Sequence, residues 1–292
     1  MCNNALEVAV LGPLGTYSHE AAAKAFGSTA IYKAQKTIAN VFSALSSDIP
    51  FGVVPEENSI FGGVIETFDF FRTPASTFVR GEVTLKVEHC LLVKSGTKLH
   101  EITRVMSHEQ ALGQCRQFIE SNLPGIEVVK TKSTAAAAEA LIDAPPNWAA
   151  ICSSICVSLF PGLEILARGV QDENANFTRF YIIAHSSTTP LTYQLESHRH
   201  MKALMRVSSP ECGSASSNMA HCFAMIQLPI TRIDRRPSLD GIPFHNVYFI
   251  EVQKETQNHH DGDSFELWTK AVMLASSRVI EKGWRSAVVG IW

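Results

Sequence analysis

Short apolar runs alternate with helical patterns along the first 185 residues of the chain. The runs that predict strands are short and apolar, and they cover residues 6–11, 51–54, 104–107, 126–130, 148–153 and 163–167. The segments that predict helices lie between these runs and cover residues 18–26, 37–47, 64–72, 109–122 and 133–142. Strands that alternate with helices predict an α/β fold with a largely parallel sheet and helices on both faces.

The N-terminal half is expected to form two lobes. Residues 76–93 can only be extended, and we expect them to carry the chain into a second lobe. The stretch NFTRFYIIA, residues 176–184, lies where the chain would return to the first lobe. Two such lobes with a cleft between them can close on a small ligand. We therefore expect one domain over residues 1–185, with a first lobe of residues 1–78 and 176–185 and a second lobe of residues 79–175.

The pattern changes after residue 185. Residues 186–201 are polar, contain proline and are rich in Ser, Thr and His, so they predict a linker. A second domain, residues 202–292, follows with strand, helix, strand, strand, helix and strand patterns at 202–208, 214–226, 230–236, 246–253, 264–282 and 286–292. This βαββαβ order is that of the ferredoxin-like α+β fold.

Composition and charge exclude several classes of partner. Hydrophobic residues make up 46% and charged residues 18%, and the net charge of −3 gives no electrostatic reason to expect a nucleic acid or an anionic membrane. No apolar run approaches the ~18 residues of a membrane helix, and the N-terminus does not resemble a secretory signal, so we expect a cytoplasmic protein.

The seven cysteines predict buried thiols and neither disulfides nor a metal site. Their odd number and their scatter through apolar segments argue against a disulfide framework. Cys152 and Cys156 would lie one helical turn apart, but no second Cys/His pair has zinc-ligand spacing.

Three loops in the N-terminal domain carry candidate functional side chains at the ends of predicted elements. Ligands of α/β folds bind at the carboxyl ends of strands. Residues 12–19, GPLGTYSH, form a turn between a strand and a helix that can offer free N–H groups to an anion, although a plain turn explains them equally well. Residues 54–63, VPEENSIFGG, carry an acid, an amide and a hydroxyl, and the alternative is that Asn58 or Ser59 only caps the helix near Val64. Residues 176–180, NFTRF, place Thr178 and Arg179 between two phenylalanines.

These motifs, with MSHEQALGQC at residues 106–115, resemble the prephenate dehydratase family in sequence and in order. The C-terminal domain resembles the ACT domain that follows the catalytic domain in that family. The resemblance covers nearly the whole chain. It implies a catalytic domain like the periplasmic-binding-protein fold, with the active site in the cleft. It also implies conversion of prephenate to phenylpyruvate, water and carbon dioxide, in phenylalanine biosynthesis, without metal or organic cofactor.

The resemblance also implies the site residues. The catalytic residues that the resemblance implies are Thr178 and, in the Glu-Asn-Ser segment, Glu57 and Asn58. The remaining substrate-binding positions lie in the matching motifs or beside them, and they are Tyr17, Ser18, His19, Ser59, Gly62, His108, Gln110, Ser133, Thr134, Phe177, Arg179 and Phe180. Two departures from the family pattern, Glu56 and Phe61, are expected to reshape the entrance of the cleft.

The chemistry suggests a role for each kind of group. Hydroxide is a poor leaving group, so a donor must stabilise or protonate it as the bond breaks. We expect Thr178 to donate a hydrogen bond to the leaving oxygen and to relay a proton from Glu57, His19, His108 or a bound water. Arg179 anchors the pyruvyl carboxylate or holds its strand, because a guanidinium is too weak an acid to give up a proton.

Neutral donors and aromatic walls complete the expected site. Asn58, Ser59, Ser133 and Thr134 are the neutral donors, and Phe61, Phe177 and Phe180 exclude water.

Regulation by phenylalanine is an open expectation. The family binds this effector between subunits at two motifs of the ACT domain. One corresponds here to Asp234, Arg235, Arg236 and Pro237, whereas the other is replaced by Gly213, Ser214 and Ala215. The altered segment lacks the apolar pair that packs on a phenyl ring, so the alternative is that the domain only holds a homodimer or homotetramer together.

Two other functions stay open. A two-lobed cleft can bind a small molecule without reacting, and the enzyme can act on arogenate, which has an amino group where prephenate has a keto group. No helical chorismate mutase segment precedes residue 6, so we do not expect a bifunctional enzyme.

Overall fold

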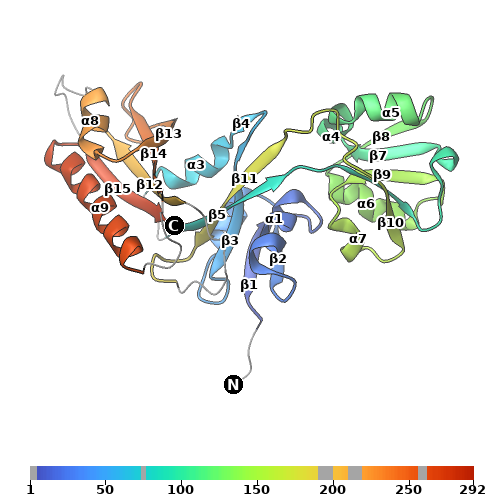
Figure 1. Ribbon diagram of the computed structural model, residues 1–292, viewed down its shortest axis with the longest axis horizontal. Helices are drawn as coiled ribbons and strands as arrows, with labels where there is room; N and C mark the ends of the chain where they lie inside the picture. Colours follow the sequence, from blue (N-terminus) through green and yellow to red (C-terminus); the bar gives the residue numbers. More distant parts are fainter. Residues whose placement is uncertain (1–4, 74–76, 190–199, 210–218, 256–261) are drawn as a thin grey trace. The chain divides into compact units, whose positions relative to one another are not determined.

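A computed structural model describes residues 5–73, 77–189, 200–209, 219–255 and 262–292 (Figure 1). Its contacts divide the chain into two compact units. Unit 1 comprises Met1–Val41, Val53–Gly62 and Val83–Phe180, and unit 2 comprises Phe42–Gly52, Gly63–Glu82 and Tyr181–Trp292. The unit boundaries cut through strands, so the domain boundaries expected from the sequence stay a prediction.

The first lobe of unit 1 is built on neighbouring strands of a mixed sheet. The strand order is β11-β3-β1-β2. The elements of this lobe, some of which continue into unit 2, are β1 (Glu7–Leu11), α1 (Tyr17–Phe26), β2 (Ile31–Gln35), α2 (Ile38–Ala44), β3 (Phe51–Asn58), β4 (Gly62–Gly63) and β11 (Phe177–Ala184). β1 pairs with β2 in parallel, and Val8, Ala9 and Val10 are fully buried, as their apolar run predicts. β2 was not predicted, because its sequence IYKAQ has the half-exposed pattern of an edge strand.

The second lobe of unit 1 is a five-stranded sheet in the order β10-β6-β9-β7-β8. Its elements are β6 (Cys90–Lys94), a 3-10 turn (Leu99–Glu101), β7 (Arg104–His108), α4 (Glu109–Gln114), α5 (Arg116–Asn122), β8 (Glu127–Thr131), α6 (Thr134–Asp143), β9 (Trp148–Cys152), α7 (Cys156–Leu159) and β10 (Leu163–Arg168). β7 pairs in parallel with β8 and β9, whereas β6 pairs antiparallel with β9 and β10. The sheet is therefore mixed, not largely parallel as expected.

Helices lie on both faces of this sheet, α4 and α5 on one and α6 and α7 on the other (Figure 1). Leu92 and Ala150 pack in the cluster that contains residues of α6, whereas their neighbours Leu91 and Ile151 pack in the cluster that contains residues of α4 and α5. The single helix predicted over 109–122 is wrong, since Cys115 leaves helical geometry at φ −113° and ψ 19° and separates α4 from α5.

Unit 2 contains the predicted βαββαβ order. Its elements are β12 (His200–Ser208), α8 (Met219–Ile226), β13 (Ile230–Pro237), β14 (Asn246–Glu255), α9 (Gly262–Glu281) and β15 (Arg285–Ile291), together with α3 (Ile65–Phe71) and the start of β5 (Phe78–Lys86). The strands run in the order β13-β14-β12-β15-β5, antiparallel except at the last pair, which joins Gly290 to Val79.

Helices cover both faces of the β12–β14 pair (Figure 1). Met205 and Ile250 pack in one cluster with Trp268 and Val272 of α9. On the other face, Phe68 of α3 lies 5.3 Å from the ring of Phe249 on β14, centroid to centroid.

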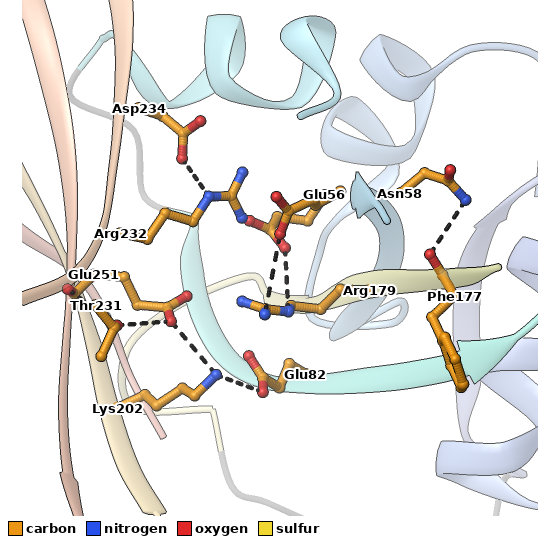
Figure 2. A network of polar contacts seen from close by, with 11 residues as sticks. Glu56, Asn58, Glu82, Phe177, Arg179, Lys202, Thr231, Arg232, Asp234 and Glu251 are labelled. Carbon is orange, nitrogen blue, oxygen red and sulfur yellow. Dashed lines mark hydrogen bonds and ion pairs between the residues drawn. The ribbon is translucent and has the colours of Figure 1, made fainter. Parts of the chain in front are cut away.

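That second face also carries a buried ion network (Figure 2). Lys202 Nζ lies 2.8 Å from Glu82 Oε1 and 3.4 Å from Glu251 Oε1, and Thr231 donates to Glu251 Oε1 over 3.2 Å. All three charged residues are less than 10% exposed. The network joins β12 and β14 to β5.

The cysteines that the structure describes are buried, as expected. Cys90, Cys115, Cys152, Cys156 and Cys222 are free thiols, and burial raises the pKa of Cys90 to about 11 and that of Cys115 to about 12. Thiols that stay protonated are poor nucleophiles. In the described part of the chain, no helix is long and apolar enough to cross a membrane.

Candidate functional site

Asn58 joins the end of β3 to the start of β11. Its Nδ2 shares two hydrogens among three acceptors, Thr178 Oγ1 at 2.9 Å, Asn176 Oδ1 at 2.7 Å and the carbonyl oxygen of Phe177 at 3.2 Å. Its Oδ1 accepts from the backbone N–H groups of Ile60 and Phe61. Backbone donors on one side and a backbone acceptor on the other fix the orientation of the amide.

The orientation of Asn58 determines how Thr178 is presented. A hydroxyl has one hydrogen to donate and two lone pairs to accept with. The bond from Asn58 occupies a lone pair of Thr178 Oγ1, so the hydroxyl hydrogen is free to point at another acceptor. This is the arrangement that a donor to a leaving oxygen requires.

Ser59 strengthens the same junction. Its backbone N–H donates to the Phe177 carbonyl at 2.8 Å, and its hydroxyl accepts from the Phe177 N–H at 2.9 Å and donates to Ala175 O at 3.1 Å. The alternative that Asn58 or Ser59 caps the following helix is wrong. Val64 is the N-cap of α3 and makes no side-chain capping bond.

Arg179 faces two glutamates of β3, of which Figure 2 labels Glu56. Its Nε is 3.7 Å from Glu56 Oε2, and its Nη2 is 4.0 Å from Glu57 Oε2. Glu56 is fully buried, so the expectation that it shapes the entrance of a cleft is wrong. A buried carboxylate needs an opposite charge nearby, and the guanidinium of Arg179 supplies one.

The phenylalanines of the expected site differ in exposure. Phe61 is 60% exposed and Phe177 is 41% exposed, whereas Phe180 is 1% exposed and packs in the core. Phe61 and Phe177 can therefore offer apolar surface to a ligand, whereas Phe180 supports the strand from behind.

The turn before α1 lies against the second lobe. Gly15 has a φ of +95°, and a Cβ there would lie 3.0 Å from Cys156 Sγ and 3.1 Å from Ala135 Cβ of α6. Only glycine fits both this conformation and this approach. Helix α1 begins at Tyr17, with Thr16 as N-cap, one residue before the predicted start.

Ser18 and His19 are buried on α1. His19 Nδ1 accepts from the Gly15 N–H at 3.2 Å, and its ring meets Tyr32 edge to face at a centroid distance of 4.8 Å. Burial lowers the pKa of His19, so the imidazole is neutral near pH 7. A neutral imidazole with an occupied Nδ1 is a poor source for the proton of a leaving hydroxyl.

The motif residues of the second lobe start two helices. His108 is the N-cap of α4 and accepts from the Gln110 N–H at 3.3 Å, while Ser133 is the N-cap of α6 and accepts from the Ala136 N–H at 3.0 Å. Thr134 is the first residue of α6, and the side chain of Gln110 is exposed. The hydroxyl of Ser107, before His108, is buried and donates to Ile151 O at 2.5 Å.

The structure thus brings together one group of predicted residues and leaves the others in separate groups. Asn58, Ser59, Phe177 and Thr178 meet at the β3–β11 junction, with Glu57 beside them in sequence and Gly62 in β4. Tyr17 and His19 belong to α1, and His108 and Ser133 begin α4 and α6.

The sequence did not predict three polar residues that form hydrogen bonds with Asn58 or with side chains of α1. Asn176 binds Asn58, His89 binds Tyr17, and Ser153 donates to Glu20. Asn176 directly precedes Phe177 in the NFTRF stretch and could have been found from that position. The other two lie 72 and 133 residues from their partners, a separation that no local pattern encodes.

The residues expected to bind an effector are only partly described. Gly213, Ser214 and Ala215 lie outside the described residues. Asp234, Arg235, Arg236 and Pro237 lie on β13. Arg236 binds Asp69 of α3 through two bonds of 2.6 and 3.1 Å, and Arg232 lies 2.7 Å from Asp234.

Comparisons of the sequence with known proteins point to one family. A family model described as prephenate dehydratase matches residues 8–188. The chain is 36% identical over 254 residues to the bifunctional chorismate mutase/prephenate dehydratase of Stutzerimonas stutzeri, which covers 87% of this chain and 67% of that protein. It is 27% identical over 255 residues to the prephenate dehydratase of Bacillus subtilis strain 168, with 85% and 89% covered.

The fold agrees with the sequence comparison. The crystal structure of prephenate dehydratase in complex with L-Phe from Arthrobacter aurescens superposes with a TM-score of 0.76, at 24% identity, over 98% of this chain and 89% of that one. The chain spans about two thirds of the length of the bifunctional relatives. On the family model and these relatives, the chain belongs to the prephenate dehydratase family.

Proposed function

We propose that the protein catalyses the decarboxylating dehydration of prephenate to phenylpyruvate, water and carbon dioxide in the biosynthesis of phenylalanine. Membership of the prephenate dehydratase family supports this reaction. The observation that carries the proposal is the 2.9 Å bond from Asn58 to Thr178, which leaves the threonine hydroxyl ready to donate.

The reaction is thermodynamically favourable, and what the enzyme must supply is a hydrogen-bond donor to the leaving hydroxide. Loss of carbon dioxide and hydroxide makes the ring aromatic and is strongly downhill, so the barrier lies in expelling a poor leaving group. A positioned hydrogen-bond donor or general acid contributes about 10²–10⁴-fold to such a step. In the proposed mechanism Thr178 donates to the departing oxygen, and electrons from the breaking C–CO2 bond form the new ring double bond.

The proton itself must come from elsewhere, because a threonine hydroxyl is too weak an acid. Burial keeps His19 neutral, which leaves Glu57, His108 or a bound water as the source. Glu57 is adjacent to Asn58 on β3, and its side chain is one-third exposed, at 33%. We assign Arg179 to holding β11 against β3, because its guanidinium already faces Glu56 and Glu57.

We further propose that residues 202–292 form a ferredoxin-like ACT domain, following a two-lobed catalytic domain of the periplasmic-binding-protein type. The βαββαβ order and the antiparallel order β13-β14-β12-β15 support the ACT assignment. The relative from Arthrobacter aurescens is described in complex with L-Phe, which supports phenylalanine as effector. The replaced segment at Gly213–Ala215 supports the alternative, a domain that only joins subunits into a dimer or tetramer.

The test is an assay of phenylpyruvate formed from prephenate near neutral pH, with and without phenylalanine. The wild type should form product, Thr178→Ser should keep part of the activity, and Thr178→Ala should fold yet lose about 10²-fold or more in kcat. Full activity of Thr178→Ala would exclude the donor role. Product from arogenate alone would change the substrate, and no turnover of either would indicate a protein that only binds.

A further inference from the structure

The first turn of α1 touches the second lobe at two points. The hydroxyl of Tyr17 lies 2.6 Å from His89 Nδ1, and Ser153 Oγ donates to Glu20 Oε2 at 2.5 Å. Tyr17 and Glu20 are three positions apart, so they lie on one face of the helix. Both contacts fall within unit 1.

Their two partners lie side by side in the second lobe. His89 immediately precedes β6, and Ser153 immediately follows β9. β6 and β9 pair antiparallel with Cys90 opposite Cys152, so the next residues along, His89 and Ser153, lie at the same end of this strand pair. The first turn of α1 therefore contacts the end of the β6–β9 strand pair at which His89 and Ser153 lie.

His89 is held in a single orientation. Its Nε2 lies 2.7 Å from Gln114 Oε1, an atom that can only accept, so Nε2 carries the hydrogen. Its Nδ1 is then the acceptor for the hydroxyl of Tyr17. The backbone N–H of His89 donates to Gln171 Oε1 at 2.8 Å, and the residue is only 2% exposed.

The electrostatics of the pair are consistent with this assignment. Burial lowers the pKa of His89, which keeps the imidazole neutral, and burial raises the pKa of Tyr17 well above its ordinary value, which keeps the phenol protonated. The hydroxyl of Tyr17 is thus occupied inside the protein, although the family motif suggests a substrate contact there.

We propose that Tyr17 is a positioning residue, which, with Glu20, His89 and Ser153, forms a latch that fixes the spacing of the two lobes. The inference rests on the proposed function, together with the expectation from the family resemblance that prephenate binds in the cleft between these lobes. A fixed spacing prepares the site for its substrate before binding. Loss of the latch would then weaken binding more than it slows the chemical step, and KM would rise more than kcat falls.

The chain offers a matched control for removing the Tyr17 hydroxyl. Tyr32 also donates a hydrogen bond, to Gly27 O at 2.5 Å, but both of these residues belong to the first lobe. Tyr17→Phe and Tyr32→Phe remove the same atom, and only the first removes a bond between lobes.

The lobe crossings provide a readout that does not depend on catalysis. In the two segments where the chain passes between lobes, the Val87 N–H donates to Asn176 O and the Val170 N–H donates to His89 O. Hydrogen exchange of these amides in the ligand-free protein reports how often the crossing opens. A buried neutral hydrogen bond changes an equilibrium by about two- to tenfold, so we expect that acceleration in Tyr17→Phe and none in Tyr32→Phe.

Exchange and kinetics together decide the proposal. Faster exchange with a raised KM in Tyr17→Phe alone supports the latch. A raised KM or lowered kcat with unchanged exchange would mean that Tyr17 touches the substrate, and faster exchange with unchanged KM would mean a contact that positions nothing; either result overturns the proposal. If the wild type does not turn over prephenate, the proposed function fails, whereas unchanged exchange in Tyr17→Phe would overturn the latch by itself.

Discussion

The oxygen and the nitrogen of the Asn58 side-chain amide have different structural roles. The oxygen closes the turn at Ile60 and Phe61, and the nitrogen fixes Thr178. An aspartate has the same shape but cannot donate, so Thr178 would turn its hydrogen toward the new carboxylate and away from a substrate.

We therefore expect Asn58→Asp to lower kcat by about 10²-fold, with a smaller change in KM. Steady-state kinetics with prephenate measure this. Asn174→Asp is the control, because Asn174 Oδ1 only accepts a bond, from Gln171 Nε2, and an aspartate oxygen can still accept it. Equal kinetics for the two variants would contradict the role of Asn58.

Glu20 gives the latch a pH dependence with a defined sign. Burial raises the pKa of Glu20 above its ordinary value of 4.5, against the opposing effect of the bond from Ser153. Above pH 4.5 and up to the raised pKa, the folded protein binds more protons at this position than the unfolded chain, so this group lowers the stability of the wild type as the pH rises.

Glu20→Gln removes this titration and keeps an oxygen that can accept from Ser153. The free energy of unfolding of Glu20→Gln, minus that of the wild type, should grow as the pH increases from 4 to 7. Urea titrations of both proteins across this range measure the difference. A difference that stays constant, or that shrinks with rising pH, would contradict the burial of Glu20.

The candidate site was predictable as far as it is local in sequence. The resemblance of the local motifs to the family pointed to Asn58, Ser59, Phe177 and Thr178, and the structure joins these residues by hydrogen bonds. The partners of α1 were not predictable, because His89 and Ser153 come near Tyr17 and Glu20 only once both lobes are folded.

At the scale of elements, prediction succeeded where the apolar pattern was strong. β1, α6, β9 and the βαββαβ order follow from apolar runs and helical periodicity. It failed where packing overrides the pattern, as at Cys115, which is buried between α4 and α5, and where an edge strand such as β2 has little apolar content.

The pairing of β15 with β5 depends on a glycine. A Cβ at Gly290 would lie 2.5 Å from Val79 Cβ and 2.7 Å from Val79 O, which leaves no room for a side chain. Gly113, within α4, has no atom within 4 Å of such a Cβ.

Gly290→Ala should therefore destabilise the protein by about 1–3 kcal/mol through overpacking. The same change at Gly113 should stabilise it by about 0.5–1 kcal/mol, since alanine is the better helix former. Thermal unfolding of the two variants beside the wild type tests both signs. A Gly290→Ala protein as stable as the wild type would show that the two strands can separate freely.

At the scale of the whole molecule, the buried ion network joins segments far apart in the chain. Lys202 is the shared partner of Glu82 and Glu251. Its removal would leave two carboxylates in a poorly solvated place.

Lys202→Met should cost about 3–5 kcal/mol of unfolding free energy, the usual effect of breaking a buried ion pair on one side. Lys270→Met is the control, because Lys270 and Glu266 form an ion pair at 2.6 Å while both stay about two-thirds exposed. That variant should change stability by less than about 1 kcal/mol. Equal losses, measured by urea denaturation, would mean that the network at Lys202 is effectively solvated.

The position of α3 limits how the C-terminal segment can be exchanged between proteins. The sheet formed by β12 and β14 is covered on one face by helices of its own and on the other by Phe68 and Phe71 of α3, with Glu82 supplying a charge. A recombination point placed between residues 186 and 201 would separate this sheet from α3, which covers one of its faces. A chimera or an isolated fragment that begins there would expose Phe249, which is fully buried in the intact chain, and would leave Lys202 without Glu82. The segment that can be exchanged between proteins as an intact unit is therefore longer than the βαββαβ segment, because it also includes residues 63–82.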